Sequence, residues 1–258
     1  MIRETFHTDS KINAFLFKKK TEMKIDFNFI EATFIDRPNR FLTRARLKGK
    51  IVESHLPDPG RLRELLIPGS KLLLKAESGD HRKTKYSTQA VYSDNVLISI
   101  NTWLPNRFVE YLIHTKKLAY LKNHTLVRRE VTVDNSRFDF HLRNKGDNLF
   151  LEVKSVTLVE EGIAKFPDAV TERGRRHVTH LGEMAEKGLK TMVLFVVQRP
   201  DADSFQPQWE RDPKFGFALF EAVKKGLEVK VIKMGIEQYE CKYLGEIPFY
   251  INPPEEQK

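Results

Sequence analysis

Short runs in which apolar and polar residues alternate occupy the first hundred positions and predict a domain built from strands. Pro57-Asp58-Pro59-Gly60 and Pro68-Gly69 end two of these runs as turns. Residues 61–66 suit one or two helical turns. The expected strands are residues 29–35, 41–47, 51–56, 71–76, 86–92 and 95–100. Many short strands with one small helix favour a compact β-barrel.

After Asn101 the spacing of apolar residues changes to a mixture of helical and strand patterns. Thr171 is a plausible N-cap for a helix with Val178, Leu181 and Met184 on one side. The run 193–197 is apolar throughout, as in a strand covered on both faces. The expected elements are a helix at 108–113, strands at 127–133, 137–142 and 150–156, the helix after Thr171, a strand at 193–197, a helix at 217–223 and a strand at 229–232.

These patterns divide the chain into four parts. We expect an N-terminal extension at residues 1–26, a barrel at 27–102, a mixed sheet flanked by helices at 103–250, and a tail at 251–258 that frays from residue 253. The fold class is therefore a two-domain α+β or α/β protein.

Two carboxylates and a lysine form the most informative motif, Asp139-x12-Glu152-x-Lys154. Both acidic residues lie in alternating strands, and the polar run 143–148 between them predicts a hairpin loop. The antiparallel register then places Asp139 opposite Glu152, about 5 Å apart, where like charges repel. A divalent cation between them would remove the repulsion. Lys154 projects from the same face as Glu152.

This arrangement is typical of a metal-dependent phosphodiesterase. Mg²⁺ or Mn²⁺ would bind Asp139, Glu152 and the backbone carbonyl of Val153, with Glu130 as a further ligand. Lys154 would orient or deprotonate the attacking water. The alternative is that Glu152 and Lys154 form only the polar face of an exposed strand. His177 and His180 have helical spacing but no further ligands, so they are interpreted as ordinary helix residues.

The net charge of +9 and the isoelectric point near 9.4 favour a polyanionic partner, most often nucleic acid. An anionic membrane surface, or ordinary solubility, is the alternative explanation. Arginines at the start of a helix bind phosphate well. The candidate nucleic-acid contacts are Arg40, Arg44, Arg46, Arg61, Arg137, Arg173 and Arg175.

The sequence argues against several classes of protein. Cys241 is the single cysteine, which excludes an intrachain disulfide and agrees with a reducing, cytoplasmic setting. The chain carries no phosphate-binding P-loop, dinucleotide fingerprint, zinc-protease helix or C-x-x-C pair. No apolar run approaches the length of a transmembrane helix.

Several blocks together resemble the sugar fermentation stimulation protein family. They include His55-Leu56-Pro57-Asp58-Pro59-Gly60, residues 137–140, residues 151–158 and residues 166–174. The resemblance implies an OB-like barrel, a PD-(D/E)xK nuclease-like domain and DNA binding, with a regulatory role in sugar utilisation suggested by the family name. Asp139, Glu152 and Lys154 match the nuclease triad, although Arg137-Phe138 precedes Asp139 where the motif would have proline.

Two functional hypotheses follow. The first is a DNA-binding nuclease that depends on Mg²⁺ or Mn²⁺. The second is a non-catalytic DNA-binding transcriptional regulator that retains the nuclease-like fold. RNA is a weaker third substrate, because OB barrels accept single strands of either sugar. The sequence leaves strandedness, sequence preference and oligomeric state open, with a homodimer among the options.

Overall fold

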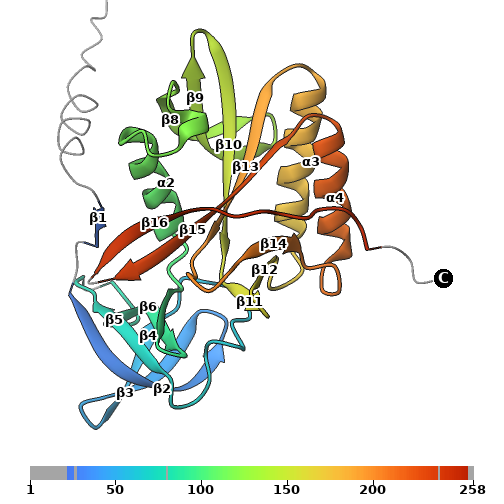
Figure 1. The fold of residues 1–258 in the computed structure, drawn as a ribbon. Helices are drawn as coiled ribbons and strands as arrows, with labels where there is room; N and C mark the ends of the chain where they lie inside the picture. The colour runs from blue at the N-terminus through green and yellow to red at the C-terminus, as the bar shows by residue number, and fades with distance from the viewer. Residues whose placement is uncertain (1–21, 26–27, 80, 238, 255–258) are drawn as a thin grey trace, which may run out of the picture.

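The first domain is a closed barrel. The computed structural model describes residues 22–25, 28–79, 81–237 and 239–254. Six strands form one sheet in the order β4-β3-β2-β5-β6-β7, and β4 also pairs with β6, which closes five of them into a ring (Figure 1). The strands are β2 (Phe29–Asn39), β3 (Leu42–Leu47), β4 (Lys50–His55), β5 (Lys71–Ala76), β6 (Tyr86–Ser93) and β7 (Val96–Ser99). The predicted OB-like barrel is confirmed.

The alternation in β3 shows why the sequence forms this barrel. Thr43 and Ala45 are buried, whereas Arg44 and Arg46 are exposed on the outside. Thr43 is compatible with the interior because its hydroxyl is 2.8 Å from that of Thr88, so the buried polar group has a partner. The barrel core also holds Phe34, Leu56, Leu62, Leu72, Leu74, Val91 and Ile98.

The second domain is a seven-stranded mixed sheet in the order β1-β16-β15-β13-β10-β9-β8. Strands β10, β13 and β15 are parallel, and helices α3 and α4 form the crossovers between them. The strands of the sheet are β1 (Met23–Lys24), β8 (Thr125–Val133), β9 (Ser136–Asn144), β10 (Asp147–Val156), β13 (Lys190–Val197), β15 (Glu228–Glu237) and β16 (Glu240–Glu246). The helices are α2 (Leu104–His114), α3 (Glu172–Glu186), α4 (Pro213–Lys224) and the short η1 (Ala119–Leu121).

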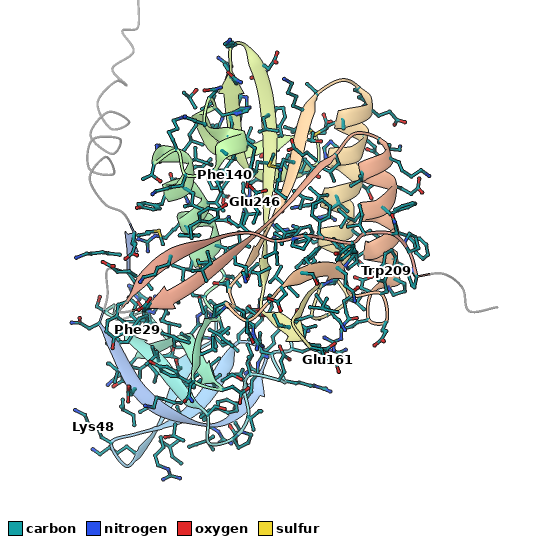
Figure 2. The ribbon with its side chains drawn as sticks, viewed as in Figure 1. Phe29, Lys48, Phe140, Glu161, Trp209 and Glu246 are labelled. Carbon is teal, nitrogen blue, oxygen red and sulfur yellow. The ribbon has the colours of Figure 1, made fainter. Side chains whose placement is uncertain are left out.

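Helices cover both faces of this sheet, which gives three layers (Figure 1). Helix α2 packs on one face, where Phe108 and Leu112 join Phe140 in the first core (Figure 2). Helices α3 and α4 pack side by side on the other face, where Leu181 and Leu219 join the second core. Residues 192–197 of strand β13 are all apolar because they contribute alternately to the two cores.

Residues 61–66 form one hydrogen-bonded turn, in agreement with the one or two helical turns expected there, and the N–H of Leu66 donates to the carbonyl of Leu62. Other elements differ from the expectation. A small sheet of β11 (Leu158–Glu160), β12 (Ile163–Phe166) and β14 (Ser204–Pro207) was not predicted, nor was β16. Strand β1 falls in the predicted extension but pairs with β16. Residues 1–21 and 255–258 lie outside the described residues.

The two domains contact each other along the second sheet. Phe29 of β2 lies where the barrel meets this sheet, and its ring centroid is 5.1 Å from that of Tyr239, between β15 and β16 (Figure 2). At the C-terminal end, Ile251, the first residue of the predicted tail, packs against the second core. Among the described residues, no helix combines the length and apolar character needed to cross a membrane.

Candidate active site

The β9–β10 hairpin brings the two predicted carboxylates together. Its turn consists of Lys145 and Gly146, both with positive φ, as a two-residue hairpin turn requires. The loop is therefore shorter than the predicted six residues, but it is shortened equally on both sides, so the expected register is kept. The ladder ends with the pair Phe140 and Leu151, and Asp139 and Glu152 are the next residues on the two strands.

Asp139 is held by two hydrogen bonds at the end of this ladder. Its Oδ2 accepts from the backbone N–H of Val153 at 2.7 Å, and its Oδ1 accepts from Nδ2 of Asn106 on α2 at 2.7 Å. Burial, followed by the nearby charge of Glu152, raises the pKa of Asp139 to about 7 despite these bonds. The two carboxylates therefore repel each other, and Asp139 holds its proton to a higher pH than a free aspartate does.

Glu152 is only 4% exposed and has an asymmetric set of partners. Its Oε1 lies 2.6 Å from Nζ of Lys154 and 2.6 Å from Nδ1 of His177 on α3. Because an ionised carboxylate can only accept, Nδ1 of His177 carries the proton. Burial alone would raise the pKa of Glu152, but the charge of Lys154 and the bond from His177 outweigh it and keep this pKa below its usual value.

The other carboxylate oxygen of Glu152, Oε2, is buried and has no hydrogen-bond partner. A buried acceptor without a partner costs free energy, and at functional sites it commonly marks the place of a ligand. Hard divalent cations bind carboxylate oxygens, and Mg²⁺ needs only one or two carboxylates because it keeps several water ligands. The described residues contain no ready-made cluster of three acidic, histidine or cysteine ligands. Asp139 and Glu152 nevertheless fit a divalent cation of this kind.

The pair lies in a cleft of about 900 Å³ between the two domains. The barrel contributes residues 37–63 to its lining, Thr102 lies where the two domains join in the chain, and the second domain contributes residues 105–173. Seven basic side chains line the cleft, namely Arg37, Arg40, Arg61, Arg63, Lys154, Lys165 and Arg173. Asp58, Asp139, Glu152 and Asp168 are the acidic ones. The lining is therefore basic around a small acidic centre.

Arg37 builds the barrel side of the cleft. Its guanidinium donates to the carbonyls of Arg40, Gly60 and Arg61 at 2.7 Å and to that of Asp58 at 3.1 Å. These four bonds tie the β2–β3 turn to the loop that follows β4. The loop thus has a fixed shape although it has no regular secondary structure.

Gly60 allows the two domains to approach at this loop. A Cβ atom at this position would lie 2.2 Å from Oδ2 of Asp168, which belongs to the second domain. Asp58 accepts from the N–H of Gly60 at 2.8 Å, and burial raises the pKa of Asp58 to about 6. The Asp-Pro-Gly block of the sequence therefore shapes the contact between the domains.

The structure brings some of the predicted site residues together and separates others. Asp139, Glu152, Val153, Lys154, Arg40, Arg61 and Arg173 all line the cleft. Five predicted residues are not in its lining, namely Glu130, Arg137, Arg44, Arg46 and Arg175.

Local pairing explains several of the residues that lie outside the cleft. Glu130 is exposed, has a φ of 52° and forms an ion pair of 3.0 Å with Arg137. The structure thus pairs this carboxylate with an arginine rather than directing it to the Asp139 and Glu152 pair. Arg44 is bound to Asp36 on the neighbouring strand, with Nε 2.8 Å from Oδ1.

Asn106, His177, Arg37, Arg63 and Lys165 also line or support the site but were not predicted. Asn106 and His177 reach the carboxylates from α2 and α3, on opposite faces of the sheet. Their sequence spacing from the motif carries no signal, because the contact depends on how each helix packs. His177 is therefore not an ordinary helix residue, as the sequence suggested, but a partner of Glu152.

The fold and the site together define a two-domain protein with an OB barrel and a nuclease-like mixed sheet. Residues 35–100 match the SfsA N-terminal OB domain, and residues 103–240 match the sugar fermentation stimulation protein RE domain. The chain belongs to the sugar fermentation stimulation protein family.

Relatives support this assignment over most of the chain. The sugar fermentation stimulation protein homolog of Clostridium kluyveri is 45% identical over 204 residues, which cover 78% of this chain and 88% of that protein. The homolog of Clostridium botulinum is 41% identical over 217 residues, with coverage of 84% and 94%. The solved structure of Pyrococcus furiosus SfsA in complex with Ca²⁺ superposes with a TM-score of 0.83 at 29% identity, covering 90% of this chain and all of that one.

Proposed function

We propose that this protein is a DNA-binding nuclease that uses Mg²⁺ or Mn²⁺. The observation that carries the proposal is the buried Asp139 and Glu152 pair, with the oxygen Oε2 lacking a partner, in a cleft lined by basic side chains. Buried like charges are costly unless a cation joins them, and a basic lining favours a polyanion.

The divalent ion would be held by Asp139, Glu152 and the backbone carbonyl of Val153. When bound, such an ion lowers the pKa of a coordinated water and offsets charge on the scissile phosphate. The relative from Pyrococcus furiosus was solved with Ca²⁺, another hard cation, which supports a divalent ion in this family. Asn106 and His177 keep the two carboxylates in position through their hydrogen bonds.

Lys154 is the residue that would act on the reacting groups. In hydrolysis, the water oxygen bonds to phosphorus, the bond from phosphorus to the leaving oxygen breaks, and that oxygen takes up a proton. The ammonium of Lys154 is held beside Glu152 at 2.6 Å, where it can orient the water and stabilise negative charge on the phosphate oxygens. Arg40, Arg61 and Arg173 would contact the backbone phosphates on either side.

The direct test is a cleavage assay with purified protein and single-stranded, duplex and branched DNA, with Mn²⁺ or with EDTA. Cleavage that needs the metal supports the nuclease. If all three substrates remain intact with Mn²⁺ but the protein retains DNA in a gel shift, the protein binds without cutting. That second function is favoured by one observation, since the ion pair of Lys154 with Glu152 already neutralises part of the site without a metal.

Replacing His177 tests how Glu152 is held. His177→Ala leaves Oε1 of Glu152 without its helix partner and is expected to weaken Mn²⁺ binding about tenfold to a hundredfold. His177→Asn is expected to restore much of the affinity, because the asparagine Nδ2 occupies nearly the position of Nδ1. Calorimetric titration measures both. Equal Mn²⁺ affinity in the wild type and His177→Ala would contradict the role of His177.

Salt dependence tests the basic lining. Each phosphate contact contributes about 0.7 to 0.9 to the slope of log affinity against log salt. The double variant Arg40→Ala and Arg173→Ala is therefore expected to lower the magnitude of this slope by roughly 1.4 to 1.8. Fluorescence anisotropy at several salt concentrations measures the slope. Arg46→Ala is the matched control, because Arg46 is exposed but lies outside the cleft lining. A slope as steep as that of the wild type in the double variant would place the phosphates elsewhere.

A further inference from the structure

Three exposed apolar side chains lie in, or next in the chain to, residues that line the cleft. Trp103 is 74% exposed and is flanked in the chain by Thr102 and Pro105, which both line the cleft. Phe41 is 49% exposed, and the guanidinium of the cleft residue Arg40 lies 6.0 Å from its ring centroid. Val170 is 64% exposed and lines the cleft itself. Segments distant in sequence thus place exposed apolar groups at one opening.

The side chain of Trp103 is not needed for the start of α2. Trp103 is the N-cap residue and makes no side-chain cap hydrogen bond. The neighbouring Asn101 serves this end instead, because its Oδ1 accepts from the N–H of Trp103 at 2.9 Å. The indole is 74% exposed and so takes little part in packing the core, which leaves its ring accessible to a ligand.

The occupant that fits aromatic faces beside arginines is a nucleic-acid strand whose bases are unpaired. Unpaired bases stack on aromatic rings and guanidinium planes, whereas a duplex hides its base faces inside the helix. We propose that the cleft takes DNA with unpaired bases, which stack on Trp103 and Phe41 while the arginines hold the phosphates. This inference rests on the proposed DNA-binding function and names its substrate class.

Trp103 offers a direct reporter of this contact. The chain has two tryptophans, and Trp209 packs against Gly216 of α4, away from the cleft lining (Figure 2). In a Trp209→Phe protein, Trp103 is the single indole. In EDTA, which prevents cleavage, a single-stranded oligonucleotide is expected to quench its emission and to bind about tenfold more tightly than the same sequence as a duplex. A tenfold difference in affinity is within the range expected for the stacking of one or two bases.

Replacement of the ring separates binding from stability. Trp103→Ser removes an indole that is 74% exposed and leaves the bond from the N–H of residue 103 to Asn101 in place, so its melting temperature is expected to be close to that of the wild type. Its affinity for single-stranded DNA is expected to fall about tenfold or more, with little change for the duplex. Phe41→Ala should also lower the affinity for single-stranded DNA. Tyr250→Ala is the control, because Tyr250 is 64% exposed and neither it nor its neighbours in the chain line the cleft.

The outcomes distinguish the two proposals. If the protein binds neither single-stranded nor duplex DNA, the proposed function and this inference both fail. If the duplex binds at least as tightly as the single strand and the emission of Trp103 does not change, the inference fails while the proposed function stands. Tighter binding to an RNA strand of the same sequence would overturn the assignment to DNA.

Discussion

Replacing Asp139 with asparagine is expected to abolish metal-dependent cleavage, with a rate loss of about a thousandfold or more. The change removes one of the two charges that would hold the divalent ion, so Mn²⁺ affinity should fall with the activity. The fold should be kept, because the amide oxygen can still accept from the N–H of Val153. Asn106 can turn its own amide to face the new NH₂ group. Calorimetry and a cleavage assay on the same samples measure both effects.

Lys154→Met should abolish cleavage without weakening Mn²⁺ binding. The ammonium of Lys154 occupies Oε1 of Glu152 and competes there with a bound cation. Its removal is therefore expected to leave Mn²⁺ affinity unchanged or higher, while cleavage is lost to a similar extent. DNA binding should persist in both variants, because the arginines of the cleft are untouched.

The exposed pair of Asp147 and Lys190 provides a matched control. It has the same 2.6 Å contact between a lysine and a carboxylate, at the turn of the same hairpin, but both side chains are 61% exposed. Asp147→Asn and Lys190→Met should therefore retain wild-type cleavage. Cleavage by Asp139→Asn at the wild-type rate would show that the activity does not come from this site.

Much of the fold could be predicted because its signals are local. The alternation of Thr43 and Ala45 with Arg44 and Arg46 gave the strand and its buried face. Thr171 was expected to cap α3, and its hydroxyl accepts from the N–H of Gly174 at 3.0 Å. The hairpin register followed from its polar turn, and it was enough to place Asp139 next to Glu152 before any tertiary contact was known.

The rest of the site depends on contacts between distant segments. His177 follows Glu152 by 25 residues and reaches it only because α3 packs on the sheet. Arg37 acts through four carbonyl groups, which any residue possesses, so the sequence gives no sign of its partners. Conversely, Glu130 and Arg137 have suitable chemistry for the site, but they pair with each other. Charge alone therefore does not identify which side chains reach the site.

The free energy of unfolding without divalent ions is expected to fall as the pH rises from about 4 to about 7. Burial raises the pKa of Asp139 from 3.8 to about 7. Between these values the folded protein keeps a proton that the unfolded chain has released, so deprotonation favours unfolding. At about 1.4 kcal/mol per unit, Asp139 accounts for a loss on the order of 4 kcal/mol. Glu152 does not contribute in this range, because its pKa is lowered and its effect appears only in more acidic solution.

Chemical denaturation at several pH values in EDTA measures this loss. Asp58, whose pKa is raised to about 6, also lowers the free energy of unfolding as the pH rises. Asp139→Asn should therefore remove the larger part of the slope and make the protein more stable than the wild type near pH 8, while Asp58→Asn removes the smaller part.

Saturating Ca²⁺ gives the decisive comparison, because a divalent ion between the carboxylates offsets the same repulsion that the proton relieves. In wild-type protein, Ca²⁺ should flatten the decline attributed to Asp139 and raise stability most at high pH. In Asp139→Asn, Ca²⁺ should change the free energy of unfolding little. In Asp58→Asn, it should raise the free energy of unfolding as much as in the wild type. Equal slopes in the wild type and Asp139→Asn, with no response to Ca²⁺ in either, would mean that the carboxylate pair is not the site of the ion.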